Sequence, residues 1–171
     1  LRLVTADSTA QQIENGFNNG NAGRTLQRLI NRPVDGMVTL LMAVAQRARD
    51  DDEGVEIAKV LHKYGARIDA TDDQIGTTAL NLCADTGRPK FLQWLVDMGG
   101  DIARSARVSP TMPIGLACEK NNYVCVAILA KAAMESRNED PRRFATLDSL
   151  SIRNNTPAFV AMERGHPECL G

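Results

Sequence analysis

One short pattern recurs four times along the chain, and it constrains the fold more than composition does. Each copy begins with a small or polar residue, continues with an apolar residue, and places a small residue at a fixed position, in "GMVTLLMAV", "GTTALNLCA", "TMPIGLAC" and "NNTPAFVAM". These small residues are Ala43, Cys83, Ala117 and Ala161, so the spacings are 40, 34 and 44 residues. A unit that recurs every 20–50 residues, roughly, cannot bury its apolar face alone. We therefore expect a stack of units that share one continuous core.

A second segment follows each copy, in "EGVEIAKVLHKYGARID", "GRPKFLQWLVDMGGDIA", "NNYVCVAILAKAA" and the shorter "GHPECLG". Its apolar residues recur at helical spacing, as at Ile57 and Leu61. Gly65 follows this run, where a left-handed C-cap is expected. Thr156 with Pro157 predicts a helix start, because Thr caps helices and Pro suits the first helical position. Each unit is thus predicted to contain a helix, a tight turn, a second helix and an extended polar link.

Three stretches match one known repeat. "TPAFVAMERGHPECL" has its Thr-Pro, Ala, Gly-His and Glu positions, "GTTALNLCADTG" with "LVDMGGDIA" matches its middle, and "VEIAKVLHKYGARID" matches its second helix and ending. With a base period of about 33 residues, the chain resembles the ankyrin repeat family. The resemblance implies an all-α fold, an α-solenoid of stacked helix-turn-helix repeats with hairpin-like links. It implies units at about 34–71, 72–104, 105–150 and 151–171, the third with a long insertion and the last incomplete.

Residues 1–33 match the pattern least. Two short helical patterns flank a turn cluster at 18–21, and Leu26, Leu29 and Ile30 stand where the second helix of a repeat carries apolar residues. The terminal unit of a stack must present a polar face to water. We therefore predict a degenerate N-terminal capping repeat over this segment.

The chain also departs from the resemblance. The position that holds a histidine in the family, and there links neighbouring repeats by hydrogen bonds, is occupied by Leu41, Asn81, Gly115 and Phe159. Most of those links should therefore be missing, and apolar stacking should stabilise the array. Two insertions are expected as well. Residues 47–53 should lengthen the turn between the helices of the first clear unit, and residues 134–147 the link between the third and fourth.

His166, Glu168 and Cys169 lie together and are residue types of metal and catalytic sites. A structural zinc would need a second ligand pair, and the sequence offers none nearby. In the repeat alignment, His166 occupies the Gly-His turn and Cys169 a buried position of a second helix. The remaining cysteines also align with buried positions, where a free thiol behaves as a small hydrophobe. We predict no metal, no cofactor and no enzymatic activity, and an intracellular, reducing compartment such as the cytoplasm.

Composition adds two exclusions. The net charge is −1 and aromatic residues make up 4% of the chain, so we expect no nucleic-acid partner. No apolar run approaches the length of about 18 residues that a membrane helix needs, so we expect no membrane insertion. Trp94, the single tryptophan, could anchor an interface, but packing between adjacent second helices is the favoured interpretation.

The resemblance implies a protein-protein interaction scaffold or adaptor that grips another protein with its link tips and with the exposed side of its first helices. By position, the predicted partner-binding residues are Met37, Gln46, Asp72, Asp73, Gln74, Ile75, Thr77, Asp85, Thr86, Arg107, Val108, Thr111, Glu119, Lys120, Ile152 and Arg153. Ile75, Val108 and Ile152 are apolar at link tips and are the preferred anchors.

Two other functions stay open. The chain begins without Met and stops inside an apolar-periodic segment, so we expect it to be part of a longer polypeptide. It could then be a regulatory segment of a larger enzyme. It could also be a structural subunit of a large assembly, with its two insertions as the contacts.

Overall fold

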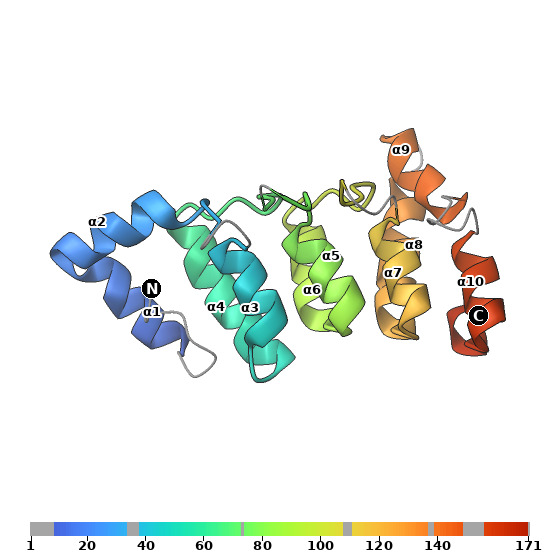
Figure 1. Ribbon diagram of the computed structural model, residues 1–171, viewed down its shortest axis with the longest axis horizontal. Helices are drawn as coiled ribbons and strands as arrows, with labels where there is room; N and C mark the ends of the chain where they lie inside the picture. Colours follow the sequence, from blue (N-terminus) through green and yellow to red (C-terminus); the bar gives the residue numbers. More distant parts are fainter. Residues whose placement is uncertain are drawn as a thin grey trace.

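The computed structural model describes residues 9–33, 38–72, 74–107, 111–136, 139–148 and 156–170, and these contain helices and no β-strand. The helices follow one another as antiparallel pairs in a single row (Figure 1). They are α1 (Ala10–Asn18), α2 (Gly20–Leu29), α3 (Leu40–Arg47), α4 (Asp51–Lys63), α5 (Ala79–Thr86), α6 (Pro89–Asp97), α7 (Pro113–Glu119), α8 (Tyr123–Glu135), α9 (Pro141–Phe144) and α10 (Pro157–Arg164), with 3-10 turns η1 (Ala145–Asp148) and η2 (Pro167–Leu170). The predicted all-α repeat solenoid is confirmed.

Two layers of helices form the array. The first helices α3, α5, α7 and α10 pack side by side, and the second helices α4, α6 and α8 pack behind them (Figure 1). Equivalent apolar side chains of successive units, such as Leu41 with Leu80 and Leu61 with Leu95, are buried between the layers. Each unit covers its neighbour's apolar face, so the core is continuous from unit to unit. The extended links lie at one edge of the array, the link edge, and the helix–helix turns lie at the opposite turn edge.

Threonine caps fix the starts of the first helices. The hydroxyls of Thr39, Thr78 and Thr156 each accept an N–H three residues later, from Met42, Asn81 and Phe159. These caps align Val44 of α3 with Cys83 of α5, so the sequence alignment that paired Ala43 with Cys83 is wrong by one residue. The predicted start at Thr156 and Pro157 is confirmed.

The sequence suggested that the first insertion lengthens the turn between α3 and α4, but most of it is helical. Only 48–50 separate α3 from α4, and Asp51–Glu53 form the first turn of α4. The Asp50 carboxylate accepts the Glu53 N–H at 2.8 Å and caps this helix. Three acidic residues in the first turn also stabilise the positive end of the helix dipole. The acidic run therefore extends the second helix instead of looping out.

The same insertion caps the next unit. The N-cap residue of α6, Arg88, makes no side-chain capping bond. Instead the Asp51 carboxylate accepts the N–H groups of Lys90 at 2.6 Å and Phe91 at 3.0 Å. The Arg88 guanidinium donates in return to the Asp50 carbonyl at 3.2 Å. The turn edge of one unit thus completes the helix start of the following one.

Asp51→Ala is expected to destabilise the array by about 1–2 kcal/mol, the usual cost of a lost N-cap. The measurement is the free energy of unfolding from urea denaturation. Asp52→Ala is the matched control, because Asp52 lies in the same helical turn and makes an exposed ion pair with Lys90 at 2.6 Å, worth at most about 1 kcal/mol. Equal losses in the two variants would contradict a capping role for Asp51.

Neighbouring links are joined by backbone-directed hydrogen bonds. Asn31 donates to the Gly65 carbonyl at 2.8 Å and accepts the Arg67 N–H at 2.7 Å. Asp69 accepts the Asp101 N–H at 3.0 Å in the next pair of links. At the histidine position, Asn81 donates to the Arg104 carbonyl at 3.2 Å. Most hydrogen bonds from the histidine position were expected to be missing. One of them is present, and an asparagine makes it.

The N-terminal helix pair does not continue this register. Helix α1 packs against α4, a second helix, and the Phe17 ring stacks on Tyr64 with centroids 4.3 Å apart. The Tyr64 hydroxyl donates to Asn18 at 2.8 Å. Helix α2 consequently runs along the link edge (Figure 1). The capping role of this pair stays a prediction, and its packing differs from that of the other units.

The second insertion is folded where it is described. Helix α9 and η1 pack against α8, and Thr146 is buried between them. The Arg143 guanidinium donates to the Gly100 carbonyl at 3.3 Å, which joins the insertion to the preceding link. The insertion is therefore an added helical turn on the second-helix layer.

Candidate partner-binding surface

Asp72 organises the tip of the second link, which joins α4 to α5. Its side chain is 1% exposed and accepts four backbone N–H groups. Oδ1 accepts from Gln74 at 2.9 Å, from Ile75, and from Gly76 at 3.2 Å, while Oδ2 accepts from Thr77 at 2.9 Å. Burial raises the pKa of Asp72, but these donors outweigh burial, so its pKa lies below the ordinary value. One ionised carboxylate thus holds the whole tip in place.

Ile75 lies on this tip and is 43% exposed. Its carbonyl accepts the Arg107 N–H at 2.6 Å, so the second link lies beside the third link, which joins α6 to α7. Gly76 has a φ of +71°, and a side chain there would come within 2.6 Å of Arg107 Cγ. Gln74 is exposed and Thr77 is half-buried next to Ile75.

The other predicted residues lie at the far end of the first helices, near the turn edge. Gln46, Thr86 and Lys120 are exposed, and Glu119 is half-buried. Lys120 forms an ion pair with Asp85 of the preceding unit at 3.6 Å. A first helix of about eight residues is roughly 12 Å long, so two groups of predicted residues flank one helical face.

Sequence reasoning missed the centre of that face. Ala43, Leu82 and Leu116 lie on successive first helices and are half-buried. Leu82 and Leu116 both stand four residues after the N-cap position of their helix, a spacing that could have identified them. The surface therefore has an apolar centre, the apolar Ile75 with polar neighbours at its link end, and polar residues at its turn end.

Two predicted contact residues are corrected by their burial. Asp72 and Thr111 are both buried within the array, so neither side chain offers a surface to a partner. Asp72 is buried because the tip folds around its carboxylate. Met37, Asp73, Val108, Ile152 and Arg153 lie outside the described residues.

Comparison with known proteins agrees with this architecture. A family model described as ankyrin repeats (many copies) matches residues 40–96, from α3 to α6. Residues 40–96 carry ankyrin repeats. It is also 26% identical over 120 residues to a protein of Acanthamoeba polyphaga mimivirus named as an ankyrin repeat protein. That alignment covers 70% of this chain but only 16% of the mimivirus protein.

Cys83, Cys118 and Cys125 lie in the core of this ankyrin array, whereas Cys169, predicted to be buried, is half-buried in η2. Burial raises the pKa of the Cys125 thiol to about 12. Burial, together with the neighbouring Cys169, also raises the pKa of Cys118 to about 12. Burial raises the pKa of the Cys83 thiol as well. Thiols with such pKa values stay protonated at neutral pH and are weak nucleophiles.

The two histidines also have structural places in the ankyrin units. The backbone N–H of His166 donates to the Ala161 carbonyl at 2.8 Å in the turn after α10. The His62 ring meets Trp94 edge-on with centroids 6.0 Å apart, so Trp94 packs between second helices, as predicted. Among the described residues, no three His, Cys, Asp or Glu side chains are grouped to hold a metal ion. None of the described helices is long and apolar enough to cross a bilayer.

Proposed function

We propose that this ankyrin array is a protein-protein interaction module, a scaffold or adaptor that is not itself an enzyme. Ankyrin repeats generally mediate contacts between proteins, and this chain has the corresponding surface. The observation that carries the proposal is Ile75, a large apolar side chain exposed on a tip that Asp72 holds rigidly. A rigid, exposed apolar side chain loses little conformational entropy on binding, which favours it as an anchor.

The proposed surface runs from this tip across the first helices. Ile75 and Gln74 lie at the link end, Leu82 and Leu116 in the centre, and Lys120 at the turn end. The partner would cover the apolar centre, while charged groups at the rim set the association rate and the specificity. A face made by several rigid units suits a folded protein better than a small molecule, because the described units are held together by a continuous core.

Ile75→Asp is expected to weaken partner capture by about tenfold or more without changing stability, because an interface anchor contributes about 2 kcal/mol or more to the free energy of binding. The measurement is quantitative affinity purification from cells that express the tagged protein, followed by a thermal melt of each variant. Met98→Asp is the matched control, because Met98 is 41% exposed at the end of α6, behind the first-helix face. Equal loss of capture in both variants, or a lowered melting temperature for Ile75→Asp, would reject the proposed anchor.

A second candidate is a regulatory ankyrin segment of a larger protein. It is favoured by the mimivirus relative, of which the alignment covers 16%. In that case the first-helix face would contact another domain of the same polypeptide. Cross-linking of the full parent protein would separate the two, since only the second candidate places contacts to Ile75 within one chain.

A further inference from the structure

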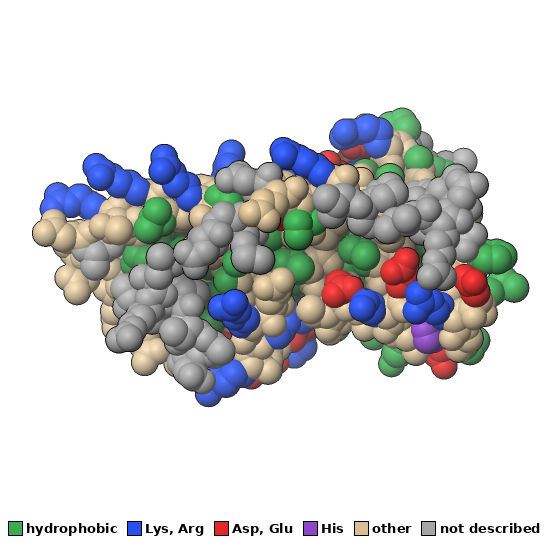
Figure 2. All heavy atoms as spheres, viewed as in Figure 1, with side chains coloured by type: hydrophobic (Ala, Val, Ile, Leu, Met, Phe, Trp, Pro, Cys, Tyr) green, Lys and Arg blue, Asp and Glu red, His purple; other side chains and the backbone are tan. Residues whose placement is uncertain are grey.

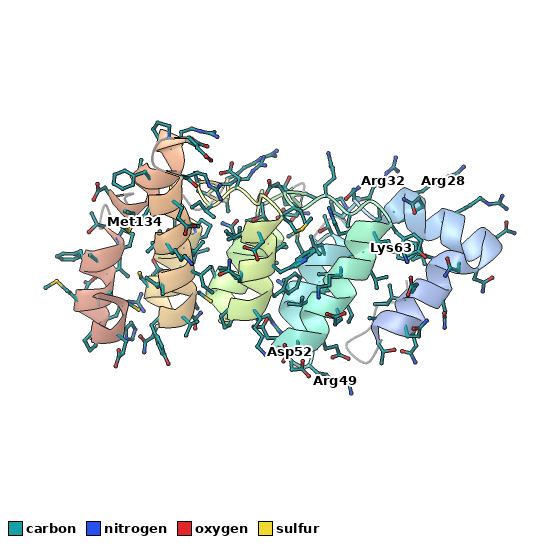
Figure 3. The ribbon with its side chains drawn as sticks, turned by 180° about the vertical axis from the view of Figure 1, so that it is seen from behind. Arg28, Arg32, Arg49, Asp52, Lys63 and Met134 are labelled. Carbon is teal, nitrogen blue, oxygen red and sulfur yellow. The ribbon has the colours of Figure 1, made fainter. Side chains whose placement is uncertain are left out.

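A row of arginine side chains follows the link edge of the array. Four of them define the arginine ridge: Arg28, Arg32, Arg67 and Arg104. All four are exposed. In Figure 2, Lys and Arg side chains stand along the upper edge of the molecule from α2 towards α9. Figure 3 shows Arg28 and Arg32 at the end of α2, at the edge opposite to Arg49 and Asp52.

Hydrogen bonds between the links place the ridge residues in order. Asn31, which precedes Arg32, accepts the Arg67 N–H at 2.7 Å. Asp69, two residues after Arg67, accepts the N–H of Asp101 at 3.0 Å. Arg104 follows in that same link. The ridge therefore crosses from the N-terminal helix pair over two successive links, with one or two arginines per unit.

Cations of the turn edge pair with carboxylates. Lys90 pairs with Asp52 at 2.6 Å and Lys120 with Asp85 at 3.6 Å. Within the part of the chain that the structure describes, no ion pair joins a ridge arginine to a carboxylate. Their positive charge is therefore available to an external anion.

Three described carboxylates of the same links, those of Asp69, Asp72 and Asp101, accept backbone N–H groups. Asp69 accepts the Asp101 N–H, and Asp101 in turn accepts the Ala103 N–H at 3.0 Å. Asp72 is buried in its tip. The exposed Asp97, at the end of α6, accepts from Gln93 at 2.7 Å. Cations thus project from this edge, while most nearby anions hold the links.

We propose that the arginine ridge binds an extended acidic polypeptide segment. Helices packed side by side are about 8–10 Å apart, so successive units repeat at about this spacing along the ridge. Arg104 lies further along its link than Arg67 does, because it comes three residues after Asp101, the residue that corresponds to Arg67. An extended chain advances about 3.3 Å per residue, so a carboxylate at every third residue matches the units. A guanidinium fork binds a carboxylate with two parallel hydrogen bonds, which gives this pairing its geometry.

A nucleic acid fits this edge less well. Single-stranded nucleic acid is held by aromatic stacking as well as by charge, and Tyr64, the aromatic residue closest in sequence to Arg67, is stacked on Phe17. A duplex or a membrane would present a broad negative surface, while the protein as a whole has a net charge of −1. A narrow line of cations suits a single extended chain.

The ridge goes beyond the proposed function, because it is a second surface at the link edge with its own ligand class. The test uses the full chain and a fluorescein-labelled peptide of about 12 residues with Glu at every third position among Gly and Ser. Fluorescence anisotropy is measured at about 50 mM and about 200 mM salt. The ridge variant replaces Arg28, Arg32, Arg67 and Arg104 by Gln. The control variant replaces four other exposed cations by Gln, namely Arg47, Lys59, Lys90 and Arg164, for the same change in charge.

The ridge variant is expected to bind the peptide about tenfold or more weakly, and the control variant within about twofold of the unaltered protein. Higher salt should reduce the difference, since exposed ion pairs are screened. A peptide of the same composition with its Glu residues in one block should bind about threefold or more weakly, because it cannot reach every unit. A thermal melt checks that each variant is folded, and the double variant R67Q/R104Q should show a partial loss if the fourfold variant is unfolded.

Four results would overturn the proposal. They are equal loss in ridge and control variants, no loss in the ridge variant, equal binding of the spaced and blocked peptides, and ridge-dependent binding of an oligo-dT or a phosphatidylserine vesicle at least as tight as that of the peptide. Ile75→Asp should leave peptide binding unchanged. Failure at the ridge is therefore distinguishable from failure of the first-helix surface.

Discussion

Phe91→Ala is expected to lower the free energy of unfolding by about 3–5 kcal/mol, the largest effect of any single substitution considered for this protein. Phe91 is 0% exposed and lies in the second-helix layer. Its ring faces α4, where a Cβ at Gly54 would lie 3.3 Å from Phe91 Cδ1, and its centroid is 6.0 Å from Trp94. Removal of the ring leaves a cavity between two units, which neither helix can close without moving from its neighbour.

Phe159→Ala is the matched control for this prediction. Phe159 is 51% exposed on α10, so the same substitution removes few packing contacts and should cost less than about 1 kcal/mol. Both variants are compared by urea denaturation followed by circular dichroism. A total stability of about 5–15 kcal/mol is typical of a domain, so the Phe91 variant should be partly unfolded well below its usual midpoint. Similar costs at the two positions would contradict the assigned packing.

Asp72→Ala is expected to cost about 2–4 kcal/mol, because it removes an ionised acceptor from four backbone N–H groups. The N–H of Gly76 suffers most, since it is buried and cannot turn to water. The tip that carries Ile75 should lose its fixed conformation, so partner capture should fall together with stability. Urea denaturation and the affinity purification described for Ile75 measure the two effects.

Asp72→Asn separates charge from geometry. It can keep an oxygen on Gln74, Ile75 and Gly76 but sets an NH2 group against the Thr77 N–H. We expect a loss of about 1–2 kcal/mol at pH 7. The pKa of Asp72 is lower in the folded protein than its ordinary value of 3.8. Its contribution is therefore complete above that value and is lost as the pH falls below it. The difference in the free energy of unfolding between wild type and Asp72→Asn should shrink as the pH falls from about 5 to about 2. A constant difference would contradict this role.

The described end of the array shows what stacking does to equivalent residues. Leu80, Asn81 and Ala84 of α5 are buried under α7, but the matching Ala158, Phe159 and Met162 of α10 are exposed. The helix has the same N-cap and the same apolar pattern in both units. Burial of these positions therefore depends on the presence of a following unit and not on the residue type.

The repeat and its helices could be read from the amino-acid order. Their signals are local. A Thr cap forms with an N–H three residues away, apolar residues at helical spacing make one face, and Gly65 adopts the predicted left-handed conformation, with a φ of +97°, just after α4. Burial of Cys83, Cys118 and Cys125 also followed from the repeat alignment, but that of Cys169 did not, because it is half-buried. The position of Trp94 between second helices followed in the same way.

Contacts between units were not foreseeable in this way. Asp72 looked like an exposed tip residue, yet the tip folds around it, and the run at 47–53 looked like a loop, yet Asp51 caps the helix of the next unit. The arginine ridge joins residues from α2 and from two separate links, which are distant in the chain. Such arrangements arise when units stack, because stacking decides which polar groups meet a backbone amide and which remain in water. The sequence of a single unit does not show where the neighbouring unit packs against it.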